Sequence, residues 1–180
     1  MDASSFIAEV EKTLGLSLRE LRSIGATPFR FGALASNKKT REALTQVSDR
    51  CLDWAADGTA FVGLMNDEAA YGVYAGPRIS PLEIFTTFEV GSHNDWDVQQ
   101  EQALAVMTEI FQVAPYVAYF ADQAGFQVRF LNAVSEAQAK QFQDQITEVC
   151  FDAITLSLDQ YGIELSEFIR KYGRLVLWWD

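Results

Sequence analysis

The chain of 180 residues contains one histidine, two cysteines and four prolines. Two cysteines are too few for a disulfide scaffold, and Cys51 and Cys150 occur in no CxxC or other metal-binding spacing. One histidine cannot supply the histidine pair of a common zinc site. The longest charge-free run, 110–121, is shorter than the roughly 18 residues of a membrane span and is broken by Pro115. We therefore predict reduced and buried thiols, no metal, no cofactor and no membrane contact.

Basic residues are scarce as well, because 14 Lys and Arg stand against 25 Asp and Glu and give a formal net charge of −11. The imbalance is concentrated in residues 51–169, which hold 18 acids and three bases. Such a charge repels nucleic acid, which we exclude as a partner. It favours a protein partner with a basic face, which long-range attraction steers toward the acids. The alternative is that the acids only keep the surface solvated.

The pattern of apolar residues predicts a single α+β domain over residues 1–180. Apolar runs bounded by turn residues predict two hairpins, and a last apolar run predicts a C-terminal strand. The predicted strands are 59–65 with 71–75, 116–121 with 126–131, and 175–179, with 28–34 as a short additional strand. The sheet is therefore antiparallel or mixed and is covered by helices.

Helical spacing and capping residues predict the remaining elements. The predicted helices are 6–14, 17–25, 36–58, 97–113, 135–161 and 165–172. In this prediction residues 1–35 form an N-terminal helical extension. Residues 80–90 stay undecided, because Ser80-Pro81-Leu82-Glu83 is typical of a helix start. In the same segment Thr86-Thr87 and alternating apolar residues favour a strand.

His93 is the only histidine and is followed closely by Asp95 and Asp97. An imidazole beside carboxylates can act as a general base or a metal ligand. These three residues therefore define the candidate pocket of a small-ligand-binding protein or an enzyme. The two aspartates are explained more simply as caps of the helix that follows. Motifs such as GxSxG, HExxH or SxxK do not occur, so we predict no catalytic residue.

The candidate partner-binding residues combine acids of the middle segment with the two tryptophans near the end of the chain. Adjacent residues of a strand point to opposite faces, so one tryptophan is expected in the core. The other, if exposed, is a candidate interface anchor, and an edge strand there offers a route to a homo-oligomer. The candidate residues are Asp67, Glu68, Glu83, Glu89, Asp95, Asp97, Trp178 and Trp179.

Two short likenesses to known families bear on function. The stretch from Glu11 to Leu18, EKTLGLSL, resembles the opening of the SUKH superfamily, many of whose bacterial members are toxin-immunity proteins. Leu18-Arg19 stands where that family has a Leu-Pro step. If 80–90 is a strand, the order of elements over residues 40–160 is similar to that of type III secretion chaperones, which are also small and acidic. The resemblances imply a toxin-immunity protein or a secretion chaperone.

The first residues, Met1 to Ser5, carry no basic charge, and charged residues interrupt the apolar ones that follow. This pattern is not that of a secretory signal, so we expect a cytoplasmic protein of bacterial origin. The leading hypothesis is a non-catalytic acidic interaction protein that binds a basic protein partner. The alternative is a ligand-binding protein or enzyme with a pocket near His93.

Overall fold

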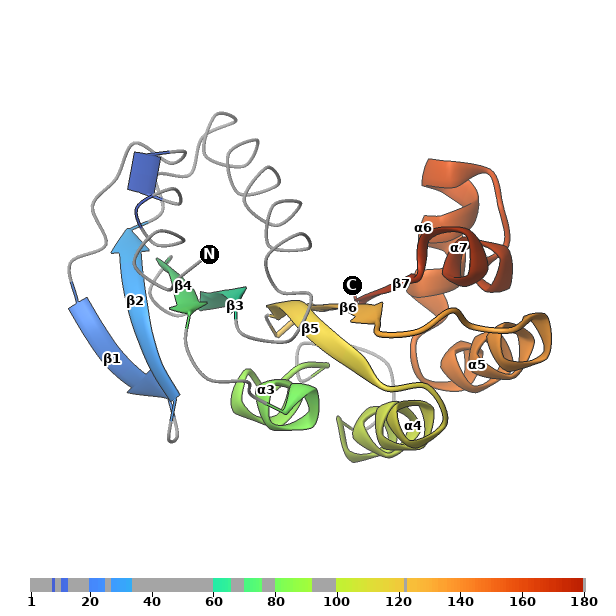
Figure 1. The fold of residues 1–180 in the computed structure, drawn as a ribbon, viewed down its shortest axis with the longest axis horizontal. Helices are drawn as coiled ribbons and strands as arrows, with labels where there is room; N and C mark the ends of the chain where they lie inside the picture. Colours follow the sequence, from blue (N-terminus) through green and yellow to red (C-terminus); the bar gives the residue numbers. More distant parts are fainter. Residues whose placement is uncertain are drawn as a thin grey trace.

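The fold is built on one sheet that combines strands from both halves of the chain (Figure 1). The computed structural model describes residues 8, 11, 12, 20–24, 27–33, 60–65, 70–75, 80–91, 100–121 and 123–179, with the backbone alone for the strands before residue 80. Seven strands in this part of the chain are ordered β1-β2-β4-β3-β5-β6-β7. They are β1 (Glu20–Ile24), β2 (Thr27–Ala33), β3 (Ala60–Met65), β4 (Ala70–Ala75), β5 (Tyr116–Ala121), β6 (Gly125–Phe130) and β7 (Arg174–Trp178).

Neighbouring strands of the sheet are antiparallel except β3 and β5, which run parallel. The sheet is therefore mixed. Three hairpins lie side by side, and β7 pairs with β6 to end the sheet. This confirms the predicted α+β class with two hairpins and a C-terminal strand, and it adds a third hairpin, β1–β2.

The helix predicted over residues 17–25 is wrong where the structure describes it. Residues 20–24 are strand β1, and each of them pairs with a residue of β2, from Glu20 with Phe31 to Ile24 with Thr27. An isolated helix of this length is marginal in water, whereas the strand gains a hydrogen-bonded partner. Because β2 also pairs with β4, residues 20–24 and 27–33 belong to the sheet and not to a helical extension. The single domain over the whole chain stays a prediction.

The undecided segment 80–90 contains a helix, α3 (Pro81–Thr87). Proline at the first helical position suits a helix start, because its missing N–H would be unpaired there in any case. Ile84, Phe85 and Phe88 are buried, and their spacing of one and four residues places them on one side of the helix. Ile84, Phe88 and Val90 of the alternating pattern are buried as well, so alternation alone does not separate helix from strand here.

The other described helices lie where the sequence predicts helices, except that one predicted helix is divided into two. They are α4 (Gln100–Val113), α5 (Glu136–Val149), α6 (Phe151–Tyr161) and α7 (Leu165–Tyr172). In Figure 1, α3 and α4 lie against one face of the sheet, and α5, α6 and α7 gather beside β7. Residues 8, 11 and 12 are helical, as predicted for 6–14. The predicted helix 36–58 lies outside the described residues.

The sequence predicts one helix over 135–161, but the structure has two helices that meet at Cys150. The backbone of Cys150 is not helical, with φ −154° and ψ 76°. In a continuous helix the Ala153 N–H would donate to the Val149 oxygen. Here the indole Nε1 of Trp179 donates to that oxygen at 2.8 Å, and Ala153 N donates to the Cys150 oxygen at 3.3 Å. A contact from the end of the chain therefore accompanies the break.

Aromatic rings connect the helices to the sheet. Phe85 of α3 meets Phe126 of β6 edge-on, with ring centroids 5.1 Å apart and an angle of 83°. Phe142 of α5 stacks on Phe130 of β6, with centroids 5.8 Å apart and an angle of 13°. All four side chains are buried. The core therefore lies on the face of β6 that carries Phe126 and Phe130, between the sheet and α3 and α5.

Two glycines that end helices are predicted to resist substitution because of their backbone alone. Gly162 and Gly173 follow α6 and α7 with φ of +66° and +62°, and a Cβ at either position would meet no atom within 4 Å. We expect Gly162→Ala and Gly173→Ala each to lower the free energy of unfolding by about 1–2 kcal/mol, measured by urea denaturation. Gly162→Asn should cost less, because asparagine tolerates this conformation. Equal losses for alanine and asparagine would contradict this explanation.

Candidate functional site

Five of the predicted site residues lie outside the part of the chain that the structure describes. They are Asp67 and Glu68, between β3 and β4, and His93, Asp95 and Asp97, between α3 and α4. The candidate pocket near His93 and the acidic turn after β3 therefore stay predictions.

Two predicted acidic residues are described, and both are exposed. Glu83 lies in the first turn of α3. Glu89 follows that helix in the left-handed conformation, with φ 50°, and accepts a hydrogen bond from Gln123 Nε2 at 3.4 Å. The same loop donates from Gly91 N to the Gln123 oxygen at 2.9 Å. Glu89 is therefore held beside the turn between β5 and β6.

The two tryptophans differ in exposure, as their adjacent positions in an extended segment predict. Trp178 is 40% exposed, whereas Trp179 is 2% exposed. Besides its hydrogen bond to Val149, the Trp179 ring meets Phe85 edge-on, with centroids 6.4 Å apart. Trp179 is therefore the tryptophan that packs in the core, as expected of one of the two. Trp178 stays a candidate anchor.

Helix α6 packs its half-buried Ile154 against the core and exposes three other large apolar side chains. Its buried residues are Ala153 and Ser157. Phe151, Leu158 and Tyr161 are 59%, 46% and 48% exposed. A turn of about 100° per residue places these three on one side of the helix. We call Phe151, Leu158 and Tyr161 the α6 stripe.

Further contacts lie at both ends of the α6 stripe. The Tyr161 ring centroid is 6.0 Å from that of Tyr172, which is 39% exposed and has Lys171 Nζ 5.2 Å from its ring centroid. At the other end, Cys150 Sγ is hydrogen-bonded to the Trp178 carbonyl oxygen at 3.1 Å. The residue before the stripe therefore touches the strand that carries the exposed tryptophan.

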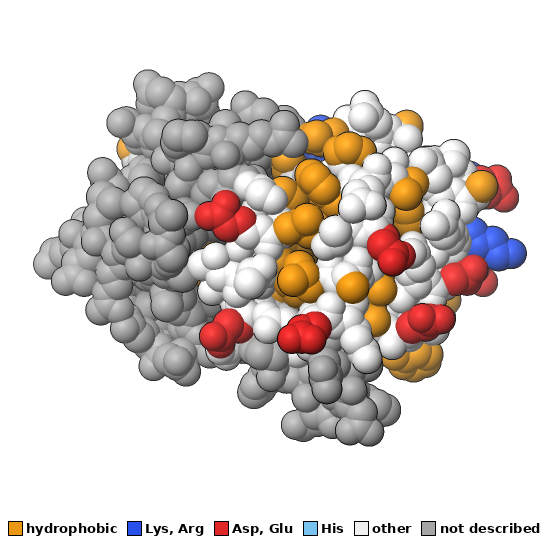
Figure 2. All heavy atoms as spheres, turned by 90° about the horizontal axis from the view of Figure 1, so that it is seen from below, with side chains coloured by type: hydrophobic (Ala, Val, Ile, Leu, Met, Phe, Trp, Pro, Cys, Tyr) orange, Lys and Arg blue, Asp and Glu red, His pale blue; other side chains and the backbone are white. Residues whose placement is uncertain are grey.

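Charge on the described part of the chain is acidic and lies at the surface. Residues 80–91, 100–121 and 123–179 contain eleven Asp and Glu and five Lys and Arg. None of the eleven acids is buried. Figure 2 shows that carboxylates are spread over the face formed by α3, α4 and α5, with apolar side chains between them. The acids on this face form a mixed acidic and apolar surface and not one compact cluster.

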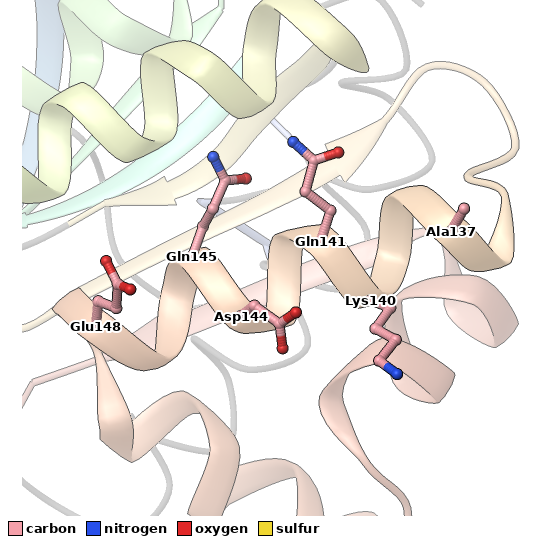
Figure 3. Close-up of a pocket in the computed structure, with 6 residues that line it drawn as sticks. All are labelled: Ala137, Lys140, Gln141, Asp144, Gln145 and Glu148. Atoms are coloured by element: carbon pink, nitrogen blue, oxygen red, sulfur yellow. The ribbon is translucent and has the colours of Figure 1, made fainter.

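An open depression of about 470 Å³ runs along α5, but its side chains do not converge on one point. It is lined by Ala137, Lys140, Gln141, Asp144, Gln145 and Glu148. In Figure 3, Gln141 and Gln145 point to one side of the helix, and Lys140 and Asp144 point to the other. Gln145 Nε2 donates to Glu109 of α4 at 2.7 Å. Gln145 therefore serves the contact between α4 and α5, and the other lining side chains do not point toward one another.

The part of the chain that the structure describes holds no metal-binding cluster and no reactive thiol. Within these residues no group of three His, Cys, Asp or Glu is arranged to hold a metal ion. Nor does this part of the chain contain a helix long and apolar enough to cross a membrane. Burial raises the pKa of the Cys150 thiol to about 12, so the nucleophilic thiolate is disfavoured at neutral pH. Cys51, the other cysteine, lies outside the described residues.

None of the protein-family models, curated proteins or solved structures compared with the chain matches it. The function must therefore be argued from the chain's own residues.

The α6 stripe is the feature of the surface that sequence reasoning missed. The prediction of one helix over 135–161 follows a single apolar stripe that includes Phe142, Ile146 and Ala153. Phe151, Leu158 and Tyr161 are spaced seven and three residues apart, which is also a helical pattern, but on another side. A second apolar side on the predicted helix is the sequence signal that could have indicated this exposed stripe.

Proposed function

We propose that this protein is a cytoplasmic, non-catalytic interaction protein that binds a protein partner with a basic face. The observation that carries the proposal is the excess of surface carboxylates, eleven against five bases in the residues described from 80 to 179. Like charge keeps other acidic proteins away, and opposite charge on a partner speeds and orients its approach.

Exposed apolar residues support the same proposal. Charge steers a partner but adds little net affinity, which comes mainly from large apolar and aromatic anchors. Trp178 and the α6 stripe provide such side chains at the surface. An immunity protein that neutralises a toxin and a chaperone that holds a secreted protein are two functions of this class. Either requires a stoichiometric complex and no catalytic residue.

The proposal predicts a complex that depends strongly on salt. We expect the immobilised full chain to retain one stoichiometric basic protein from the lysate of its native cells at about 50 mM NaCl, and to release most of it at about 500 mM. The physical reason is that salt shortens the range over which surface charges attract. The bound protein is identified by mass spectrometry.

The control for this experiment is an unrelated immobilised protein of similar size and net charge. A protein that both supports retain equally would be bound by charge alone and would contradict the proposal. Retention that does not change between the two salt concentrations would contradict its electrostatic part. If no protein is retained, the result would contradict the proposal and favour the alternative of a ligand-binding pocket near His93.

A further inference from the structure

We infer that α6 opens as a separate unit while α5, α7 and the sheet stay folded. This conformational property goes beyond the proposed function and does not rest on it. A segment of a folded protein opens separately when it buries few apolar side chains and when the elements around it remain joined without it. Helix α6 meets both conditions.

Few buried side chains attach α6 to the rest of the protein. Its buried residues are Ala153 and Ser157, and Ile154 is half-buried against the core. The Tyr161 ring centroid is 4.8 Å from that of Phe168, but Tyr161 is itself 48% exposed. The buried residues of the neighbouring helices include larger ones, which are Phe142, Ile146 and Val149 in α5 and Leu165, Phe168 and Ile169 in α7. Release of α6 therefore removes less apolar surface from the core than release of α5 or α7.

Helices α5 and α7 contact each other directly. Gln143 Oε1 of α5 accepts a hydrogen bond from Ser166 N of α7 at 2.8 Å. At the surface, Arg170 Nη1 of α7 lies 3.0 Å from Glu136 Oε2 of α5. Neither contact includes a residue of α6. The two helices therefore stay joined when α6 is released.

Breaks in the helical backbone separate α6 from its neighbours at both ends, so its opening need not spread. Cys150, before the helix, is not helical, and Gly162, after it, has a φ of +66°. The Trp179 indole N–H donates to the oxygen of Val149, which lies on the α5 side of the break. This hydrogen bond therefore persists when α6 opens.

Opening changes both the released segment and the surface beneath it. An isolated helix of eleven residues is marginal in water, so the released segment loses its helical structure. The chain from α5 to α7 then forms a loop, and it uncovers the sides of α7 and β7 that α6 contacts in the closed form. The opening of α6 therefore controls access from solvent to these surfaces.

Hydrogen exchange of the full chain, followed residue by residue by nuclear magnetic resonance, measures this opening. After correction for intrinsic rates, we expect the amides of α6 to exchange about 100-fold or more faster than the slowest amides of α5. Equal protection of the two helices would overturn the inference, because α6 would then open only when the whole protein unfolds.

Two buried alanines distinguish local opening from unfolding of the whole protein. Ala153 of α6 is 1% exposed, and Ala139 of α5 is 0% exposed. We expect Ala153→Gly to accelerate exchange in α6 about fivefold, because it weakens the closed helix. Ala139→Gly is the matched control and should change exchange in α6 less than about twofold, because α5 is folded in both the closed and the opened form.

The two substitutions give opposite results under the two explanations. If α6 exchanges only through unfolding of the whole protein, Ala139→Gly and Ala153→Gly accelerate its exchange equally, and the inference is wrong. A response of α6 to Ala153→Gly alone supports it. Neither result affects the proposed function, which the retention of a basic protein tests separately.

Discussion

Replacing Trp179 with alanine is expected to lower the free energy of unfolding by about 3–5 kcal/mol, the usual range for a fully buried large aromatic residue. Trp179 is 2% exposed and donates its indole N–H to Val149 at 2.8 Å. Alanine would leave a cavity beside Phe85 and remove the donor that satisfies the last carbonyl of α5. The loss is measured by urea denaturation followed by far-ultraviolet circular dichroism.

The neighbouring tryptophan provides the matched control. Trp178→Ala removes a side chain of the same size, but one that is 40% exposed, so we expect a loss below about 1 kcal/mol. Trp179→Phe keeps an aromatic ring without the N–H group and should give an intermediate loss. Equal losses for Trp178→Ala and Trp179→Ala would show that the two residues do not differ in burial as described.

The protein is expected to lose stability steeply above pH 9, because the buried Cys150 thiol binds its proton more tightly in the folded state. The pKa of this thiol is raised from 9.0 to about 12, mainly by burial, with a smaller increase from the nearby Asp152 carboxylate and an opposing decrease from backbone hydrogen bonds at Ala153 and Trp178. Below pH 9 the thiol is protonated in both states, so its contribution is fully present. Above pH 9 the unfolded chain releases the proton and the folded protein does not, which favours unfolding. The loss is about 1.4 kcal/mol per pH unit up to pH 12.

Urea denaturation at a series of pH values from 7.5 to 10.5 measures this loss, with Cys150→Ala as the control. The alanine variant should be less sensitive to pH between 9 and 10. Above pH 10 both proteins should lose stability, because burial also raises the pKa of Tyr116 above its usual value. The Tyr116 hydroxyl donates to the Met107 oxygen at 2.9 Å and cannot ionise without losing this contact. An unchanged slope in Cys150→Ala would contradict the role of the thiol.

Local patterns in the sequence were sufficient for most of the strands and for the ends of several helices. The alternation of Phe126, Val128 and Phe130 with polar residues predicts β6, because successive side chains of a strand face opposite ways. Gly162 and Gly173 predict the ends of α6 and α7, because glycine adopts the left-handed conformation at low cost. These features depend on neighbours within a few residues.

Features that depend on residues far away in the sequence could not be predicted from local patterns. Residues 17–25 have a helical pattern, but pairing with β2 makes residues 20–24 a strand. The choice between Trp178 and Trp179 for the core depends on which side of the sheet faces α3, and adjacent positions alone cannot provide that answer. The acidic character of the candidate surface followed from composition, because charged side chains remain in water wherever the fold places them.

The break between α5 and α6 is the clearest case of a distant contact that changes a local structure. Apolar periodicity runs through Cys150 without interruption, so the sequence indicates one helix. The chain returns nearly thirty residues later, where Trp179 donates to the Val149 oxygen and the Trp178 oxygen pairs with Cys150 Sγ. The hydrogen bond from Trp179 takes the place of the one that Ala153 would make in a continuous helix, and in the separate helix that follows, Phe151, Leu158 and Tyr161 are exposed. The sequence determines which residues of the α6 stripe are apolar, whereas only the folded chain decides that they are exposed, because exposure depends on which side of α6 packs against the rest of the protein.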